Sequence, residues 1–184
     1  MEDQTFRKRS MSELNRLSEE AFSQETKSPF VFVLDSIRSL NNVGSVFRTA
    51  DSFNAAHIYL CGVTGTPPHR DINKTALGAT DTVFWSHFPS IENCLKQLKS
   101  EGFFLYAIEQ THGSIELHQI HFESDQKYAF IMGNEVSGVS DEALQLVDGV
   151  IEIPQFGTKH SLNVSVSAGI IAWHYVNQML VESR

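Results

Sequence analysis

Three short segments of this 184-residue sequence concentrate small and polar side chains of the kinds that bind ligands. The first segment spans residues 35–51 and contains Asn42 and Arg48. Asn42 is expected at the N-cap of a helix, because asparagine is a favoured cap, and Arg48 in the second turn. Arg48 would lie beside the apolar stripe of that helix, where an arginine usually has a partner. The alternative is a solvated helix residue without a role in a site.

Two further segments follow apolar runs in the second half of the chain. Residues 132–138, MGNEVSG, contain glycines that let the backbone turn and approach a ligand closely, and Glu135 can supply an acidic group. Residues 153–166, IPQFGTKHSLNVSV, place Ser161 and Asn163 at the start of the last predicted helix. An ordinary turn would explain the first of these patterns. In the segment at 153–166, helix capping explains either Ser161 or Asn163 well. It explains the two together less well, because they flank the apolar Leu162.

Predicted strands and helices alternate along the chain and place these segments at strand ends. The apolar run at 30–34 is typical of a strand that is buried on both faces. Further strands are expected at 56–61, 82–85, 103–108, 128–132 and 150–153, and helices at 43–53, 91–100, 141–147 and 163–180. This alternation predicts an α/β domain with a mainly parallel sheet flanked by helices. In such a sheet, ligands bind beyond the carboxyl ends of the strands.

The composition is that of an ordinary globular domain, with 41% hydrophobic and 20% charged residues. Four apolar residues at helical spacing between positions 14 and 22 predict a short helical extension within 1–28, which leaves 29–184 as the main domain. No apolar run is long enough to cross a bilayer, and the polar N-terminus does not resemble a secretory signal. We therefore expect a cytoplasmic protein, with Cys61 and Cys94 as buried thiols.

The net charge of −8 argues against a nucleic-acid partner, because such partners usually require a basic face. Positive charge is local instead. Arg7, Lys8 and Arg9 are adjacent, and other cations fall in or near predicted loops and helix starts, namely Arg38, Arg48, Arg70, Lys74 and Lys159. An acidic protein can still bind RNA through a small basic cleft, with weaker non-specific attraction.

Taken together, the three segments resemble the motifs of the SpoU/TrmH family of the SPOUT methyltransferases. N-x-G-x-x-x-R-x-A-D is matched at residues 42–51, and M-G-N-E-x-x-G-x-S at residues 132–140. I-P-x-x-G-x-x-x-S-L-N-V-S-V-x-A-G is matched at residues 153–169. Each motif is modest alone, but the three in this order are highly specific. The resemblance extends from about residue 30 to the end of the last predicted helix.

The resemblance implies an S-adenosyl-methionine-dependent enzyme that methylates a ribose 2'-hydroxyl in tRNA or rRNA. It implies a C-terminal trefoil knot, a rare exception to unknotted topology, and a homodimer whose active site is completed across the interface. A final helix with apolar residues on more than one side also favours a dimer, because it is too apolar to face water alone. The resemblance assigns cofactor binding, largely through backbone groups, to Met132, Gly133, Ile153, Leu162 and Asn163.

For the reaction itself, the resemblance assigns the catalytic role to Arg48, surrounded by Asn42, Glu135, Ser161 and Asn163. A guanidinium group stays protonated at any ordinary pH. We therefore expect Arg48 to stabilise the developing alkoxide and to anchor a phosphate, and the proton acceptor stays open.

Further RNA contacts are expected in a loop at residues 64–74. The loop follows a predicted strand and carries His69, Arg70 and Lys74. It does not identify the nucleotide that is modified. Aromatic residues at 84, 85 and 88 either stack on RNA bases or belong to the core or a dimer interface.

Two other functions are weighed against this one. A nucleotide-binding α/β protein such as a dehydrogenase is disfavoured, because G-x-G-x-x-G is missing after the first strand and no Walker sequence occurs. A non-catalytic RNA-binding member of the same fold is the second alternative, but all the motif residues are present. No metal site is expected, because His112, His118 and His121 are irregularly spaced and have no cysteine partner.

Overall fold

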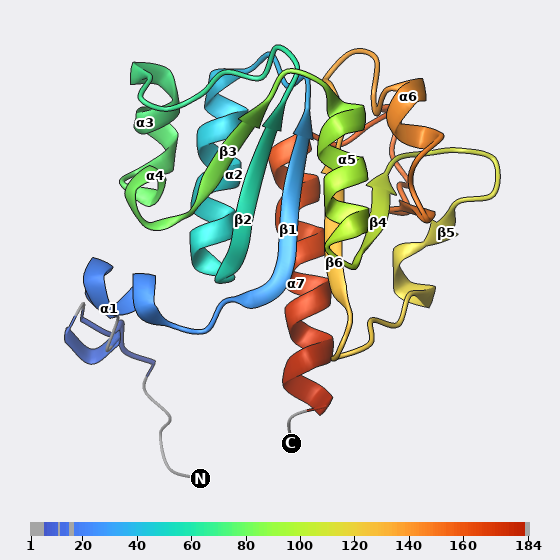
Figure 1. The fold of residues 1–184 in the computed structure, drawn as a ribbon. Helices are drawn as coiled ribbons and strands as arrows, with labels where there is room; N and C mark the ends of the chain where they lie inside the picture. Colours follow the sequence, from blue (N-terminus) through green and yellow to red (C-terminus); the bar gives the residue numbers. More distant parts are fainter. Residues whose placement is uncertain (1–5, 11, 15–16, 183–184) are drawn as a thin grey trace, which may run out of the picture.

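The computed structural model describes residues 6–10, 12–14 and 17–182 (Figure 1). Within these residues, seven strands form one sheet in the order β3-β2-β1-β6-β4-β7-β5, and every pairing is parallel. This arrangement confirms the predicted α/β class. The strands are β1 (Ser28–Asp35), β2 (Ala55–Cys61), β3 (Trp85–Phe88), β4 (Phe103–Ile108), β5 (Ile115–Glu116), β6 (Lys127–Met132) and β7 (Gly149–Glu152).

Helices cover both faces of the sheet (Figure 1). One layer contains α2 (Leu40–Ser52), α3 (Arg70–Ala76), α4 (Ala79–Thr82) and α7 (Val164–Glu182), and the other contains α5 (Ile91–Ser100) and α6 (Asp141–Leu144). Two short 3-10 turns, η1 (Ser12–Leu14) and η2 (Leu117–Gln119), and the short helix α1 (Glu19–Gln24) complete the described elements. None of the described helices combines the length and the apolar character needed to span a bilayer.

Two apolar clusters, one on each side of the sheet, hold these layers together. Successive residues of a strand point to opposite faces, so Phe30 and Phe32 of β1 join the cluster under α2 and α7. Val31 and Val33 join the cluster under α5. The run at 30–34 is therefore buried on both faces, as its continuous apolar character predicts.

Most predicted elements are present, but one strand was misplaced. The strand expected at 82–85 is wrong, because residues 79–82 form α4 and the strand begins at Trp85. The Thr82 hydroxyl donates to Asp51 Oδ1 at 2.6 Å, which ties this turn to α2. Trp85 is the first residue that pairs with β2, opposite Ile58. The expected helix at 141–147 ends earlier, at Leu144, and α3 and β5 were not predicted.

The helical extension expected within residues 1–28 is shorter than predicted. Leu14 lies in η1, and the only α-helix among the described residues of this stretch is α1, which holds Ala21 and Phe22. Residues 15 and 16 lie outside the described part of the chain. Leu17 lies in neither element, so the spacing of the four apolar residues does not reflect one helix.

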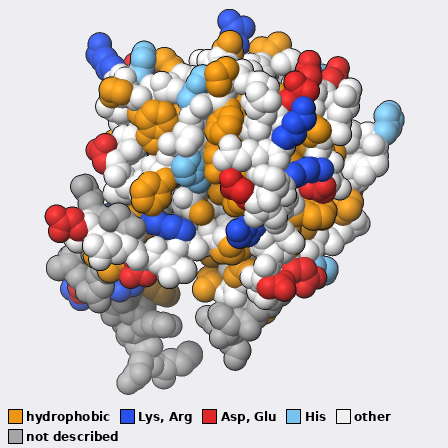
Figure 2. Space-filling view, in the orientation of Figure 1, with side chains coloured by type: hydrophobic (Ala, Val, Ile, Leu, Met, Phe, Trp, Pro, Cys, Tyr) orange, Lys and Arg blue, Asp and Glu red, His pale blue; other side chains and the backbone are white. Residues whose placement is uncertain are grey.

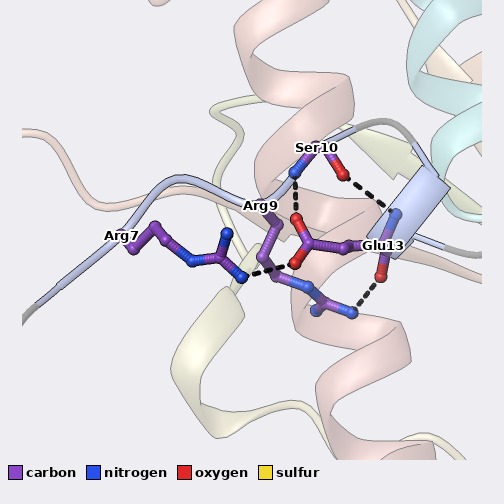
Figure 3. A network of polar contacts seen from close by, with 4 residues as sticks. All are labelled: Arg7, Arg9, Ser10 and Glu13. Atoms are coloured by element: carbon purple, nitrogen blue, oxygen red, sulfur yellow. Dashed lines mark hydrogen bonds and ion pairs between the residues drawn. The ribbon is translucent and has the colours of Figure 1, made fainter.

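A network of polar contacts organises the first described residues (Figure 3). Arg7 donates to the Glu13 carboxylate at 2.6 Å, and Arg9 donates to the Glu13 carbonyl oxygen at 2.6 Å. The backbone N–H of Ser10 donates to the same carboxylate at 2.6 Å. Hydrogen bonds from Ser10, together with Arg7, lower the pKa of Glu13. This carboxylate offsets part of the positive charge of the basic run at 7–9.

Both cysteines are buried and free, as expected. Cys61 ends β2 and Cys94 lies on α5. A hydrogen bond with Cys94 and burial raise the pKa of the Cys61 thiol. A raised pKa keeps the thiol protonated, so Cys61 behaves as a small apolar side chain.

Candidate functional site

A cleft of about 670 Å³ opens beyond the carboxyl ends of β4, β6 and β7. Its walls come from the loop at 109–111, the loop at 133–139 and the segment at 153–164. The second and third sequence segments therefore meet at one place, as the rule on strand ends predicts. All five residues expected to bind a cofactor line this cleft, namely Met132, Gly133, Ile153, Leu162 and Asn163. Three of the residues expected near the reaction also line it, namely Glu135, Ser161 and again Asn163.

The loop after β6 is closed on itself. The backbones of Asn134 and Gly138 exchange two hydrogen bonds of 2.9 Å each. The Asn134 side chain also donates to the Ser36 carbonyl oxygen at 2.6 Å and accepts from the Val136 N–H at 2.9 Å. A Cβ at Gly133 would collide with the backbone between Gly138 and the next residue. Glycine is required at position 133 because two backbone segments pass each other there.

The Glu135 carboxylate binds the N-terminal end of α2. It accepts hydrogen bonds from the N–H groups of Arg38 and Ser39, both at 3.0 Å, and from Asn42 Nδ2 at 2.9 Å. Burial acts to raise the pKa of Glu135, but the hydrogen bonds from Arg38, Asn42 and Ser39 outweigh burial and the pKa is lowered. A carboxylate with a lowered pKa and several donors already bound is a weak proton acceptor.

Asn42 connects the first segment to the other two. Its Nδ2 donates to Glu135, and its Oδ1 accepts from Asn163 Nδ2 at 3.1 Å. Asn163 Oδ1 accepts from the Ser165 N–H at 2.9 Å and thereby caps α7. The N-cap role expected for Asn42 is wrong, because Ser39 caps α2 and accepts from the Asn42 N–H at 3.3 Å. The Asn42 side chain is thus available to contact the other segments.

Arg48 lies in a second cleft, of about 590 Å³, formed by α2, α3 and the start of α7. The first turn of α7 lines both clefts, since Asn163 and Val164 face the first and Ser165 the second. The partner expected for Arg48 is not found: its side chain is exposed and forms no hydrogen bond or ion pair with any residue described. The buried stripe of α2 lies to one side of Arg48 and leaves its guanidinium in solvent.

The lining of the second cleft suits an anion. Arg48 and Lys74 supply two positive charges, whereas the lining hydroxyl groups of Ser45, Ser52, Thr75 and Ser165 already donate to oxygen atoms of the protein. The lining contains no aspartate or glutamate. Cationic side chains such as these bind phosphate oxygens.

The segment expected as a loop at 64–74 is partly helical. Arg70 begins α3, and His69 caps this helix by accepting from the Asp71 N–H through Nδ1 at 3.1 Å. Of the three residues predicted to bind RNA in this segment, Lys74 alone lines either of the two clefts. His69 and Arg70 are exposed at the start of α3.

The aromatic residues at 84–88 do not form one surface. Phe84 is 54% exposed, whereas Trp85 packs against the α2–α7 cluster and Phe88 against the α5 cluster. Figure 2 shows hydrophobic side chains on the β2–β3 side of the sheet, with charged side chains of both signs scattered around them. Two of the three aromatic residues therefore serve mainly as partly buried packing groups.

The histidines considered as metal ligands do not gather. His118 Nδ1 lies 3.4 Å from Glu116 Oε2 on the surface. Across the ranges that the structure describes, no group of three or more His, Cys, Asp or Glu side chains is placed to hold a metal ion.

Sequence analysis missed Glu109 and Gln110, which lie in the wall of the first cleft. Glu109 Oε2 accepts from the Val139 N–H at 3.0 Å, and Gln110 Nε2 donates to the His160 carbonyl oxygen at 2.8 Å. Both residues directly follow the predicted strand at 103–108. The rule that singled out the other segments, polar residues directly after an apolar strand, would have found them.

Comparison with known proteins extends over most of the chain. Residues 29–173 match the model of the SpoU rRNA Methylase family. The chain is 28% identical over 172 residues to the tRNA (guanosine(18)-2'-O)-methyltransferase of Thermus thermophilus, covering 94% of this chain and 87% of that protein. It is 29% identical over 153 residues to the 23S rRNA (guanosine-2'-O-)-methyltransferase RlmB of Neisseria meningitidis, covering 83% of this chain and 60% of that protein.

Solved structures show the same fold. The TrmH/SpoU tRNA modifying enzyme of A. aeolicus has a TM-score of 0.79 at 23% identity, covering 90% of this chain and 82% of that one. The AdoMet-bound rRNA methyltransferase from Sinorhizobium meliloti has a TM-score of 0.77 at 25% identity, covering 89% and 62%. The matched residues include all three sequence motifs. The chain therefore belongs to the SpoU rRNA methylase family.

Proposed function

We propose that this chain transfers the methyl group of S-adenosyl-methionine to a ribose 2'-hydroxyl of tRNA or rRNA in the cytoplasm. Family membership supports this, since the relatives named above are 2'-O-methyltransferases of guanosine in tRNA or 23S rRNA. The observation that carries the proposal is the hydrogen-bonded chain from Glu135 through Asn42 to Asn163. These hydrogen bonds connect the three sequence motifs beside the first cleft.

The first cleft fits the cofactor in size and chemistry. Its volume lies within the range of about 300–1,000 Å³ that small-molecule sites occupy. Ile108 and Leu144 contribute apolar wall, and the carboxylates of Glu135 and Asp141 suit a ligand with sulfonium and ammonium cations. When bound, the cofactor supplies a methyl group already activated by the sulfonium. We assign its binding to Met132, Gly133, Ile153, Leu162 and Asn163.

The second cleft is proposed as the place where the RNA backbone binds. Arg48 and Lys74 would contact phosphate oxygens, and His69 and Arg70 at the start of α3 would extend this contact. Arg48 would also stabilise the negative charge that develops on the attacking ribose oxygen. Because Arg48 is a permanent cation, it does not remove the proton.

In and beside the first cleft, the other motif residues position the reactants. Glu135 is a weak base with its donors already bound, so we assign it to holding α2 and Asn42 in place. Ser161 lines the cofactor cleft and Asn163 caps α7, which begins between the two clefts. These residues would set the distance and angle between methyl donor and ribose, which is a large part of catalysis for such a transfer.

A homodimer is proposed as the active form, with a trefoil knot in the C-terminal part of the domain at 29–184. Within one chain, Arg48 does not line the cleft that holds the cofactor residues. In a dimer, the second cleft of one protomer would face the first cleft of its partner across the interface. Exposed apolar side chains on α7 support such an interface, with Val166 49%, Trp173 55% and Leu180 51% exposed.

The proposal is tested by incubating the purified protein with methyl-labelled S-adenosyl-methionine and total tRNA or rRNA. Nuclease digestion and mass spectrometry should reveal 2'-O-methylated nucleosides, and Arg48→Ala is the inactive control. Calorimetry should detect cofactor binding without RNA. Cofactor binding with no methylation of any RNA would favour a non-catalytic RNA-binding protein, and no binding at millimolar cofactor would refute the proposal. Light scattering that returned a stable monomer of 20.7 kDa would refute the dimer.

A further inference from the structure

Glu109 and Gln110 line the first cleft directly after β4. Glu109 directly follows β4, which lies between β6 and β7 in the sheet. The loop at 133–139 follows β6, and the segment at 153–163 follows β7. A residue at this position can therefore reach both walls of the cleft, one on each side.

Glu109 holds the loop at 133–139. Its Oε2 accepts from the Val139 N–H at 3.0 Å, and its Oε1 accepts from the Gln110 N–H at 2.9 Å. Both carboxylate oxygens thus bind a backbone N–H group. The amide of glutamine has one acceptor oxygen, so it would leave one of these two N–H groups facing its own NH₂ group.

Gly138 shows how closely the carboxylate is seated against this loop. Gly138 has a φ of 71°, in the left-handed region that favours glycine. A Cβ at this position would collide with the Glu109 carboxylate. The Glu109 carboxylate therefore occupies the space that a side chain at position 138 would fill, and it packs directly against the cleft wall.

Gln110 reaches the opposite wall. Its Nε2 donates to the carbonyl oxygen of His160 at 2.8 Å, next to Ser161 and Leu162 in the cleft lining. Neighbouring side chains on one short loop therefore bind the two cleft walls, which come from different parts of the sequence. Glu109 and Gln110 together form a clamp across the cleft.

We infer that Glu109 and Gln110 are positioning residues for the cofactor, which hold the loop at 133–139 and the segment at 153–163 at the separation that cofactor binding requires. This inference rests on the proposed function, because it assigns the cleft to S-adenosyl-methionine. The clamp acts through the backbone at Val139 and His160 and not on the reacting atoms. Its loss should therefore weaken cofactor binding far more than it slows methyl transfer.

Calorimetry with S-adenosyl-methionine tests the clamp on Glu109→Gln and Gln110→Ala. Loss of one hydrogen bond to a charged acceptor predicts a Kd about tenfold higher for Glu109→Gln. The exposed bond of Gln110 predicts a smaller rise, about twofold to threefold. The matched control is Glu123→Gln, because the Glu123 side chain is exposed at the opposite end of β6 and makes no hydrogen bond or ion pair with the described residues.

Two further measurements separate positioning from other roles. Hydrogen exchange on the protein without cofactor should show faster exchange of the Val139 amide in Glu109→Gln than in the wild type. Steady-state kinetics should show the effect mainly in the KM for the cofactor rather than in kcat.

The outcomes distinguish this inference from the proposed function. A wild-type protein that binds no cofactor overturns the proposed function. If the wild type binds and both clamp variants bind equally well, the inference is wrong. Weaker binding with unchanged exchange at Val139 would mean that Glu109 contacts the cofactor directly, which also overturns the positioning role. A drop confined to kcat would do the same.

Discussion

Replacing Glu135 by glutamine tests how the loop after β6 holds α2. The carboxylate accepts from the N–H groups of Arg38 and Ser39 and from the Asn42 side chain. Glutamine has one acceptor oxygen and no charge, so it cannot keep all three bonds. It also removes a negative charge from the N-terminal end of a helix, where such a charge is stabilising.

The expected loss is moderate because Glu135 is an exposed residue. A negative charge at a helix N-terminus contributes about 0.3–1 kcal/mol. A typical hydrogen bond contributes about 0.5–1.5 kcal/mol. Together they give about 1–2.5 kcal/mol, and a chain of this size loses about 2–4 °C in Tm for each kcal/mol, so Tm should fall by about 2–10 °C.

The lowered pKa of Glu135 makes this loss depend on pH. Its pKa in the folded protein lies below the ordinary value of 4.5. The stabilisation is therefore complete above the ordinary pKa and is lost as the pH falls through the folded-state value. Wild type and Glu135→Gln should differ in Tm at neutral pH and converge in acid.

Thermal melts followed by circular dichroism, from neutral to acidic pH, measure this difference. Glu123→Gln serves as the control, since it removes one negative charge at a side chain without a partner among the described residues. Equal Tm values for wild type and Glu135→Gln at neutral pH would refute the reasoning. So would a difference that stayed constant into acid, because it would not come from the charge.

Three other variants test the two clefts. Arg48→Ala should lower the rate of methyl transfer by about 10²–10³-fold, with unchanged cofactor affinity. Its Tm should not change, because Arg48 is exposed and unpaired among the described residues. A collapsed Tm or full activity would contradict this prediction. Lys74→Gln should weaken RNA binding and reduce by about one the slope of log affinity against log salt, measured by filter binding; an unchanged slope would exclude a phosphate contact. Gly133→Ala should abolish cofactor binding in calorimetry, because its Cβ meets the backbone beside Gly138, and normal affinity would show that the loop adapts.

The sheet could be predicted from the sequence because its strands are almost wholly apolar. The run at 30–34 and the strand at 103–108 were placed correctly for this reason. The strand at 85–88 was misplaced because Ser86 and His87 interrupt its apolar pattern, and its position is set by pairing with β2. The two residues of β5 are too few to leave a pattern of their own.

For the site, the sequence predicted which residues gather but not how they touch. Gly133, Leu162 and Asn163 meet in one cleft because strand ends of a parallel sheet meet at one edge. The bond from Asn163 to Asn42 could not be predicted, because it depends on how α2 and α7 pack. Arg48 has no partner among the described residues because it lies to one side of the buried stripe of α2, which also depends on packing.

The position of β1 in the sheet affects how the chain is made. β1 lies between β2 and β6, although four strands separate β1 from β6 in the sequence. During synthesis, β1, β2 and β3 therefore leave the ribosome while one edge of β1 has no neighbour. That edge belongs to an apolar strand, which is a template for pairing with other nascent chains until β6 arrives. A fragment that ends before β6 should aggregate, and the yield of intact protein should depend on chaperones that shield this edge.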